Sequence, residues 1–386
     1  MKLVGIIGGG QLAWMMGDAA KKLGVDLLVQ TPSKSDPAVS IAQEAVFAPV
    51  DDAASTVVLA KKSDVITFEN EFVNLDALSI LENQGVCFRP RLAALAPLLD
   101  KYHQRCYLQE LGLPVPKFFA LDENLNTVEL ENLQSKIEHL GFPVVVKSRR
   151  HGYDGQGTFI IKDWASLQEK LTTNPSLFLV EEFVPFEREL AIIAARSVDG
   201  EVVTYPVVET QQEQQVCRRV IAPAEITSNQ AAEIEAIAHT LLNSLEAVGV
   251  FGIELFLTPD GKVLVNEIAP RTHNSGHFSL DACETSQFEQ HLRAVCGLAL
   301  GNTAIKTPSA VMVNLLGYET SHSDYQSQRQ KIAEIPQSYI HWYGKTESRP
   351  GRKLGHVTVL LDSQNRDDAI AIAHTIESIW YPSEFF

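Results

Sequence analysis

The stretch FGIELFLTPDGKVLVNEIAPR, residues 251–271, decides the fold because it predicts a hairpin whose strands carry two glutamates. Asp260 and Gly261 stand between two apolar runs, and an Asp-Gly pair in that setting is one of the strongest short-range hairpin signals. Counting along both strands from a two-residue turn at this pair, we expect Glu254 to lie directly opposite Glu267, on one face of the sheet.

Two glutamates that face each other predict a positive partner between them. Like charges directly opposed on a sheet cost up to roughly 1 kcal/mol relative to a neutral pair. A divalent cation that prefers carboxylate oxygen, such as Mg2+ carried in with a nucleotide, removes this cost, and Mn2+ would suit the same ligands. The alternative is a solvent-facing pair screened by a lysine. The predicted register places Phe256 and Val265 on the same face as the glutamates.

Length and composition indicate an ordinary globular protein of two or three domains. The chain has 386 residues, of which 45% are apolar and 21% charged. Its net charge of -16, from 32 basic and 48 acidic residues, disfavours nucleic acid as a partner. The five cysteines show no paired spacing, and no leader or membrane-spanning run is evident, so we expect a cytoplasmic protein without membrane contact.

The first hundred residues predict a doubly wound sheet, with a helix over 11–23 and strands over 2–7, 25–29, 64–68 and 86–88. The loop GGGQLA at 8–13 matches the Gly-x-Gly-x-x-Ala dinucleotide fingerprint. An NAD site also needs an acid at the end of the second strand, and Gln30 stands there instead. We therefore predict a phosphate cradle and no NAD; the alternative is that the glycines only allow close packing.

A second domain starts near residue 100 and carries polar groups in an order that suits a nucleotide. Lys147 ends the apolar strand 144–147, and a buried lysine needs a nearby anion such as a phosphate. The loop GYDGQG at 152–157 can present backbone N–H groups to phosphate oxygens and close over a substrate. Glu181 and Glu182 end the next strand, where the backbone and a carboxylate would meet an adenine and a ribose.

Three further polar clusters lie at strand ends or in loops. Glu69-Asn70-Glu71 closes an apolar strand at its carboxyl end, where carboxylates would accept hydrogen bonds from sugar hydroxyls or an amine. The run RTHNSGH at 271–277 suits an anion or the charge of a transition state. Residues 345–353 hold four cations in an acidic protein and predict a phosphate-binding loop. For the first and third clusters, solvated surface is the alternative; in the second, a structural role is the preferred interpretation of His277 taken alone.

Together these motifs resemble the ATP-grasp superfamily and, within it, the N5-carboxyaminoimidazole ribonucleotide synthases of purine biosynthesis. The resemblance rests on GGGQL at 8–12, GYDGxG at 152–157, NExAPRxHNSGH at 266–277 and RPGRKxGH at 349–356. It implies an α/β ATP-grasp fold in three domains: a Rossmann-like domain 1–99, an ATP-grasp domain 100–301 with the lid loop 152–157, and a strand-rich domain 302–386.

The resemblance also implies an activity. The enzyme would use MgATP and bicarbonate to carboxylate 5-aminoimidazole ribonucleotide through carboxyphosphate, releasing ADP and phosphate, with neither biotin nor NAD, as a homodimer. Alternatives are an ATP-grasp ligase acting on another phosphorylated amine, a silent nucleotide-binding module and, least favoured, a nicotinamide oxidoreductase.

Site residues are carried over from the family position by position. The residues that would surround ATP are Lys101, Lys147, Gly155, Gly157, Glu181, Glu182, Val184, Glu189, Gln212 and Asn266, with Glu254 and Glu267 on magnesium. The residues that would act on bicarbonate and the intermediate are Tyr153, Asp154, Arg271 and His273. The residues that would hold the ribonucleotide are Gln11, Leu12, Glu69, Asn274, Ser275, Lys345, Arg352 and Lys353. Positions that depart from the family pattern are Trp14, Gln156, Gln212 and Ala269.

Overall fold

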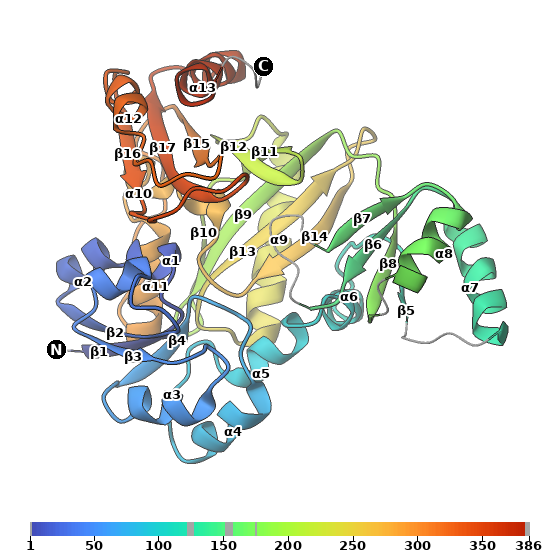
Figure 1. Cartoon of the computed structure of the whole chain (residues 1–386), viewed down its shortest axis with the longest axis horizontal. Coiled ribbons are helices and arrows are strands. Elements are labelled where there is room, and N and C mark those ends of the chain that lie inside the picture. The colour runs from blue at the N-terminus through green and yellow to red at the C-terminus, as the bar shows by residue number, and fades with distance from the viewer. Residues whose placement is uncertain (1, 122–126, 151–156, 174–175, 383–386) are drawn as a thin grey trace.

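The computed structural model describes residues 2–121, 127–150, 157–173 and 176–382, which form three β-sheets with helices packed around them (Figure 1). The first sheet is parallel, in the order β3-β2-β1-β4. Its strands are β1 (Lys2–Ile7), β2 (Val25–Thr31), β3 (Glu44–Phe47) and β4 (Val65–Phe68). The helices of this region are α1 (Gln11–Trp14), α2 (Gly17–Leu23), η1 (Pro37–Ser40), α3 (Ala53–Ala60), α4 (Leu75–Asn83), α5 (Leu92–Leu95) and η2 (Ala96–Leu98).

Two expectations for this region are wrong. The segment 11–23 forms two helices, α1 and α2, with a break at Met15 and Met16. The start of α2 packs closely on the residue that follows η1, since a Cβ on Gly17 would lie 3.2 Å from Ile41. Residues 86–88 form no strand, only an isolated bridge between Phe88 and Ile66. The apolar character of this segment instead serves packing, since Phe88 stacks on Phe68 with ring centroids 6.0 Å apart.

The second sheet is antiparallel, in the order β5-β8-β6-β7, and lies with α7 and α8 at the right of Figure 1. Its elements are β5 (Phe118–Leu121), α7 (Thr127–Leu140), β6 (Val144–Ser148), β7 (Thr158–Ile161), α8 (Trp164–Thr173) and β8 (Phe178–Glu182). Helix α6 (Lys101–Glu110) precedes it, and Asp100 caps this helix by accepting from the N–H groups of Tyr102 and His103.

The third sheet runs in the order β14-β13-β9-β11-β12-β15-β17-β16, with β10 added beside β9. Its strands are β9 (Arg188–Arg196), β10 (Val202–Thr204), β11 (Val208–Glu213), β12 (Val216–Ala222), β13 (Gly249–Leu257), β14 (Val263–Ala269), β15 (Ser309–Leu316), β16 (Ser338–Trp342) and β17 (Lys353–Leu361). Because β12 pairs with β15, the C-terminal strands continue the sheet of the central region. The remaining helices are α9 (Ser228–Leu245), η3 (Asn274–Gly276), α10 (Ser279–Ala282), α11 (Gln287–Cys296), α12 (Gln326–Ala333) and α13 (Arg366–Trp380).

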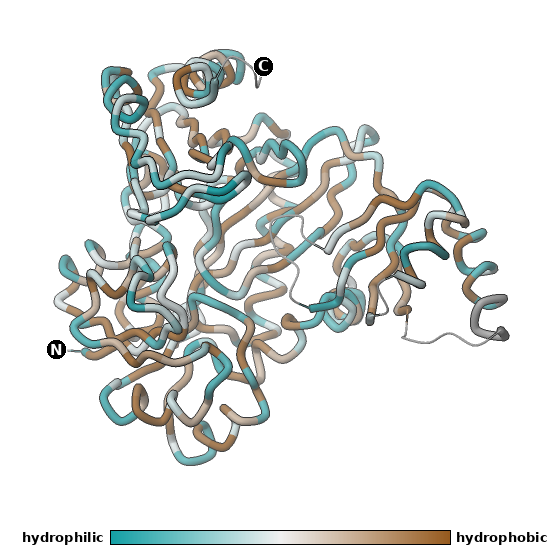
Figure 2. Tube along the Cα trace, viewed as in Figure 1, coloured by the Kyte–Doolittle hydropathy of each residue, from teal (hydrophilic) through white to brown (hydrophobic). Residues whose placement is uncertain are grey.

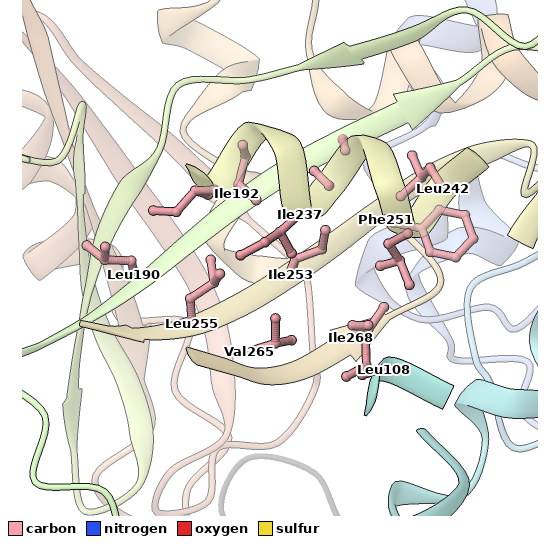
Figure 3. Packing of buried hydrophobic residues seen from close by; sticks show 14 of the residues in the cluster. Leu108, Leu190, Ile192, Ile237, Leu242, Phe251, Ile253, Leu255, Val265 and Ile268 are labelled. Carbon is pink, nitrogen blue, oxygen red and sulfur yellow. The ribbon is translucent and has the colours of Figure 1, made fainter. Parts of the chain in front are cut away.

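The core of the central region forms where α9 covers one face of β9, β13 and β14 (Figure 3). Thr227 and Gln230 form a capping box at the start of α9, and buried residues at helical spacing, including Ile237 and Leu242, face the strands. On the strands Ile253 and Leu255 point into this core, so their neighbour Glu254 must point to the opposite face. Figure 2 shows the same contrast, with apolar strands and hydrophilic loops. Among the described helices, none has the length and apolar character needed to cross a bilayer.

The buried ring of His291 in α11 predicts acid sensitivity of the fold. Its Nδ1 accepts from the N–H of Val250 at 3.1 Å, and its Nε2 lies 2.8 Å from Thr67 Oγ1. Burial lowers the pKa of His291 from 6.5 to about 4, so the neutral ring stabilises the fold above pH 6.5, and this contribution is lost as the pH falls through 4. From the size of that shift we expect a loss of roughly 3 kcal/mol between pH 7 and pH 4. Unfolding by denaturant at both pH values, compared between wild type and His291→Gln, measures it; equal losses in both proteins would contradict the prediction.

Candidate functional site

The two glutamates of the hairpin lie opposite each other, as the sequence predicts, since Glu254 pairs with Glu267 across β13 and β14. The predicted two-residue turn is wrong. Thr258 N–H donates to the carbonyl of Lys262, and Gly261 takes a φ of 82° in a three-residue loop. That loop shifts the register by one residue, and an irregularity beside Glu254 shifts it back.

The shifted register corrects one neighbour of the glutamates. Val265 pairs with Leu255 in the hydrophobic core and does not share the acidic face, whereas Phe256 pairs with Leu264. The irregularity leaves Asn266 unpaired in the ladder. Its side chain lies on the acidic face, where Asn266 Nδ2 donates to Glu254 at 3.4 Å.

A lysine contacts the glutamate pair, as predicted by the alternative in which a lysine and not a metal screens the two charges. The pair lines a cavity, however, and does not lie on the outer surface. Lys101 Nζ is 2.5 Å from Glu267 Oε1 because the cap at Asp100 fixes the first turn of α6. Besides the hydrogen bond from Asn266, Glu254 has a weaker contact, 3.4 Å from His273 Nε2. Burial, and next the charge of Glu267, raise the pKa of Glu254 to about 7. The charged form of Glu254 is therefore disfavoured beside Glu267, and Lys101 does not compensate for this.

Beside the hairpin, Glu181 at the end of β8 is buried between two cations. Lys147 Nζ lies 2.7 Å from Glu181 Oε2, and Arg105 of α6 forms an ion pair with the other oxygen. Burial alone would raise the pKa of Glu181, but Arg105 and Lys147 lower it to about 2. Lys147 also donates to Asn266 Oδ1 at 3.0 Å, so this group is tied to the glutamate hairpin.

Arg105 is a site residue that sequence reasoning missed. It is 2% exposed, and its guanidinium also donates to the carbonyl of Asn266 at 2.5 Å. The signal that could have found it is its spacing, since Arg105 follows Lys101 by four residues and so lies on the same face of α6. An arginine there anchors both Glu181 and β14.

The first glycine loop, residues 8–13, binds a carboxylate of the protein itself and so does not form an open phosphate-binding site. Glu69, which follows β4, fits against this loop so closely that a Cβ on Gly10 would lie 2.5 Å from its Oε1. The backbone N–H groups of Gly10 and Leu12 hydrogen-bond this carboxylate. Burial outweighs these bonds and raises the pKa of Glu69 to about 7. The prediction of a phosphate cradle is therefore wrong for these two N–H groups.

Arg271 and His273 stand between the glutamates and the first domain. Arg271 binds Glu71 through two hydrogen bonds of 2.5 and 2.9 Å, which explains why a carboxylate follows β4 at that position. His273 Nδ1 lies 2.9 Å from Ser275 Oγ. Asn274 exchanges two amide hydrogen bonds with Asn314 of β15, at 2.9 and 2.8 Å.

The cationic loop 345–353 reaches the first glycine loop from the other end of the chain. Lys345 Nζ donates to Gln11 Oε1 at 2.5 Å and to the carbonyl of Lys353 at 2.7 Å. Arg352 donates to the carbonyl of Glu347 at 2.7 Å. Residues 334 positions apart in sequence thus meet at one place.

These groups line one cavity of about 680 Å³. Its wall contains nineteen of the predicted residues: Gln11, Leu12, Glu69, Lys101, Lys147, Glu181, Glu182, Val184, Glu189, Gln212, Glu254, Asn266, Glu267, Arg271, His273, Asn274, Lys345, Arg352 and Lys353. Ser275 and Gly157 are not part of this wall. The predicted residues Tyr153, Asp154 and Gly155, and the departure at Gln156, lie outside the described residues.

The cavity has an apolar end that sequence reasoning did not find. Phe183, Phe186 and Phe256 line it, and the rings of Phe186 and Phe256 stack in parallel with centroids 4.8 Å apart. An apolar end with flat rings suits a planar base. The cations of loop 345–353 and the glutamate pair line the same cavity.

Comparison with known proteins assigns all three parts of the chain. A model of the ribonucleotide synthetase preATP-grasp domain matches residues 1–97, the ATP-grasp domain matches 106–288, and the phosphoribosylaminoimidazole carboxylase C-terminal domain matches 310–369. The N5-carboxyaminoimidazole ribonucleotide synthase of Synechococcus elongatus is 54% identical, over 98% of this chain and 95% of that protein. That of Bacillus subtilis is 38% identical, over 93% and 91%.

Solved structures agree with the sequence comparisons. The N5-carboxyaminoimidazole ribonucleotide synthetase of Thermotoga maritima superposes with a TM-score of 0.86 at 39% identity, covering 98% of both chains. The Aspergillus clavatus enzyme, solved with ADP and 5-aminoimidazole ribonucleotide, superposes with a TM-score of 0.89 at 30% identity, also covering 98% of both. The expected ATP-grasp fold is therefore confirmed. The chain belongs to the ATP-grasp superfamily and, within it, to the N5-carboxyaminoimidazole ribonucleotide synthase family.

Proposed function

We propose that this protein carboxylates the amine of 5-aminoimidazole ribonucleotide with bicarbonate, at the expense of ATP, in purine biosynthesis. The observation that carries the proposal is that one cavity joins an apolar end for a base, a pair of glutamates with two lysines, and a cationic loop. These are the three environments that a nucleoside triphosphate and a phosphorylated acceptor need when they react with each other.

The triphosphate would lie along the lysines and the glutamate pair. Its base would enter the apolar end, beside Val184 and Glu182, while Lys147 neutralises charge on the transferring phosphoryl group. The donor set suits Mg2+, because Glu254 and Glu267 present hard carboxylate oxygens whose charge one lysine does not balance. When bound there, Mg2+ would supply charge stabilisation to the phosphates. Glu189 and Gln212, which hydrogen-bond each other, would meet the ribose.

The ribonucleotide would lie at the end of the cavity that loop 345–353 lines. Lys345, Arg352 and Lys353 offer their cations to its phosphate, and arginine suits this role because its planar fork matches phosphate oxygens. Gln11, Leu12 and Asn274 complete this end. Glu69 lines the same cavity, so its carboxylate would accept hydrogen bonds from the sugar hydroxyls or the amine.

In the proposed reaction a bicarbonate oxygen attacks the γ-phosphorus of ATP, and the bond to the leaving ADP oxygen breaks. The amine nitrogen then forms a bond to the carboxyl carbon, the C–O bond to phosphate breaks, and the amine loses a proton. Arg271, oriented by Glu71, and His273 would position bicarbonate and stabilise the mixed anhydride. Tyr153 and Asp154 stay predicted participants, as does closure of the 152–157 loop over the site.

Several finer predictions accompany this proposal. We propose domains at 1–99, 100–301 and 302–386, and the family matches at 1–97, 106–288 and 310–369 lie inside these ranges. A homodimer in the cytoplasm, without nucleic-acid or membrane partners, stays a prediction from the sequence and the resemblance.

Phosphate release from MgATP tests the function directly. We expect release that requires both bicarbonate and 5-aminoimidazole ribonucleotide to reach its full rate, with one carboxylated product per ADP. Release that responds to another phosphorylated amine and not to this one would favour a different ATP-grasp ligase. ATP binding without any acceptor-dependent release would indicate a silent nucleotide-binding module.

Lys353→Ala is expected to raise the KM for the ribonucleotide by roughly 10- to 100-fold while kcat changes little, since it removes one charge-assisted contact to the phosphate in ground and transition states alike. Steady-state kinetics with ATP saturating measure this. The matched control is Arg349→Ala in the same loop, because Arg349 is largely exposed and pairs only with Glu347 among the contacts described. An unchanged KM in Lys353→Ala would indicate that this loop is solvated surface and does not bind the phosphate.

A further inference from the structure

A carboxylate stands beside the end of β2 that the proposed mechanism does not use. Asp36 lies five residues after that strand, and the hydroxyl of Thr31, the last residue of β2, donates to Asp36 Oδ2. Thr31 is itself buried against the first glycine loop, since a Cβ on Gly9 would lie 2.5 Å from its Oγ1. The N–H of Ala38 donates to the carbonyl of Gly9 at 3.0 Å, which ties the segment after Asp36 to the same loop. The fold therefore places a carboxylate at the carboxyl end of β2, where the strand itself has only Gln30 and Thr31.

The side chain of Asp36 is available to a ligand. Asp36 is partly buried and lines the cavity, next to Ser35 and Pro37, which line it too. Although Asp36 directly precedes η1, its side chain does not cap that helix. The contact with Thr31 holds one oxygen, and an ionised carboxylate accepts about four hydrogen bonds in all. A bound molecule that carries hydrogen-bond donors would therefore find acceptor capacity here.

The charge of Asp36 is unexpected at this end of the cavity, which the cationic loop 345–353 lines. Asp36 lies within electrostatic reach of Arg352: burial, and next Arg349, lower the pKa of Arg352, whereas Glu347 and Asp36 oppose this change. A carboxylate near a bound phosphate lowers the affinity for that phosphate, because like charges repel each other. A compensating gain must come from an uncharged donor of the same ligand. In a sugar phosphate the nearest such donors are the sugar hydroxyls.

Two carboxylates thus approach the first glycine loop, and their surroundings differ. Gly9 packs on Thr31 at the end of β2, whereas Gly10 packs on Glu69 after β4. The charge that acts most strongly on Glu69 is that of Arg271, which opposes the rise that burial causes in its pKa. Glu69 therefore belongs with the residues proposed to act on bicarbonate, and Asp36 with the residues proposed to hold the phosphate.

We propose that Asp36 is a specificity-determining residue for the ribonucleotide, whose carboxylate accepts a hydrogen bond from the 2′- or 3′-hydroxyl of the ribose. Glu69 is then left to accept from the amine. An acid at the end of the second strand binds ribose hydroxyls in the same way in dinucleotide-binding sheets, although here Glu69 occupies the glycine loop that a pyrophosphate would need. The inference rests on the proposed function for the identity of the ribonucleotide.

Binding of deoxy analogues tests the contact without requiring turnover. Isothermal titration calorimetry gives the Kd of 5-aminoimidazole ribonucleotide and of its 2′-deoxy and 3′-deoxy forms. In the wild type, at least one deoxy form should bind about 10- to 100-fold more weakly, because a hydrogen bond to a charged group is lost. Asp36→Ala should weaken binding of the ribonucleotide by a similar factor. The same deoxy form should then bind this variant within about threefold of the ribonucleotide, since the hydroxyl has lost its partner.

Asp18→Ala is the matched control, because the side chain of Asp18 on α2 is 98% exposed, and it should leave all three Kd values unchanged. Unchanged binding of the ribonucleotide in Asp36→Ala would overturn the proposal. So would a deoxy form that is disfavoured as strongly in Asp36→Ala as in the wild type. If Asp36→Ala does not fold, the wild type decides, since equal affinity for the ribonucleotide and both deoxy forms contradicts the contact. A wild type that binds the ribonucleotide in a hydroxyl-dependent way but releases no phosphate with it would refute the proposed function and support the role of Asp36.

Discussion

Glu267→Gln is expected to lower acceptor-dependent phosphate release by at least roughly 1,000-fold, equivalent to about 4 kcal/mol of transition-state stabilisation. The substitution keeps the size of the side chain but removes one of the two facing carboxylates that suit Mg2+. Glu254→Gln should act in the same direction, since Glu254 is the other half of the pair. A phosphate-release assay at saturating MgATP, bicarbonate and ribonucleotide measures the loss.

The stability of Glu267→Gln separates a metal ligand from a structural residue. The variant loses the contact with Lys101 but also loses the repulsion between the glutamates, so its stability should stay within about 1 kcal/mol of wild type. Glu235→Gln on the exposed face of α9 is the matched control and should change neither quantity. Normal phosphate release in Glu267→Gln would remove the metal role from this position.

Arg105→Met is expected to give a large loss of stability, roughly 3 kcal/mol, or about 4 °C in the thermal midpoint of a chain of 386 residues. The arginine and its partner Glu181 are both 2% exposed at their side chains, so removing the cation leaves a carboxylate that only Lys147 still neutralises. The loss falls at the lower end of the range for broken buried pairs because Lys147 stays. Thermal unfolding monitored by circular dichroism measures it.

A surface ion pair provides the control for this variant. Arg91 pairs with Glu246, but their side chains are 55% and 63% exposed, and such pairs contribute less than about 1 kcal/mol. Arg91→Met should therefore lower the midpoint by less than about 1 °C. Equal changes in the two variants would show that burial of the Arg105 pair adds nothing to stability.

The local part of the site could be predicted because it depends on short-range signals. Alternating apolar residues set which faces of β13 and β14 are buried, and this pattern fixed Glu254 opposite Glu267 although the predicted turn was wrong. Without compensation, the one-residue shift in strand register that the loop causes would place one glutamate on the core face. The irregularity at Asn266 prevents this. The apolar pattern therefore determines the register of the two strands more strictly than the turn does.

The tertiary part could not be predicted in the same way. That Glu69 fills the first glycine loop depends on how the end of β4 meets the end of β1, and a glycine-rich sequence alone does not distinguish a carboxylate from a phosphate. The contacts of Arg105 likewise depend on packing between α6, β8 and β14. The apolar end of the cavity depends on how the segment between β8 and β9 packs against β13. The resemblance supplied Lys345 and Gln11 separately, whereas only the fold shows that they touch.

The central claim is that Glu254 and Glu267 together hold the divalent cation of the nucleotide. A crystal structure of the protein with Mn2+ and ADP tests it most directly, because the anomalous signal of manganese locates the ion independently of the protein. We predict one ion bonded to an oxygen of each glutamate and to the ADP phosphates, with Lys101 moved from Glu267 Oε1. An ion bound to the phosphates alone, with either glutamate turned away or still paired with Lys101, would contradict the claim.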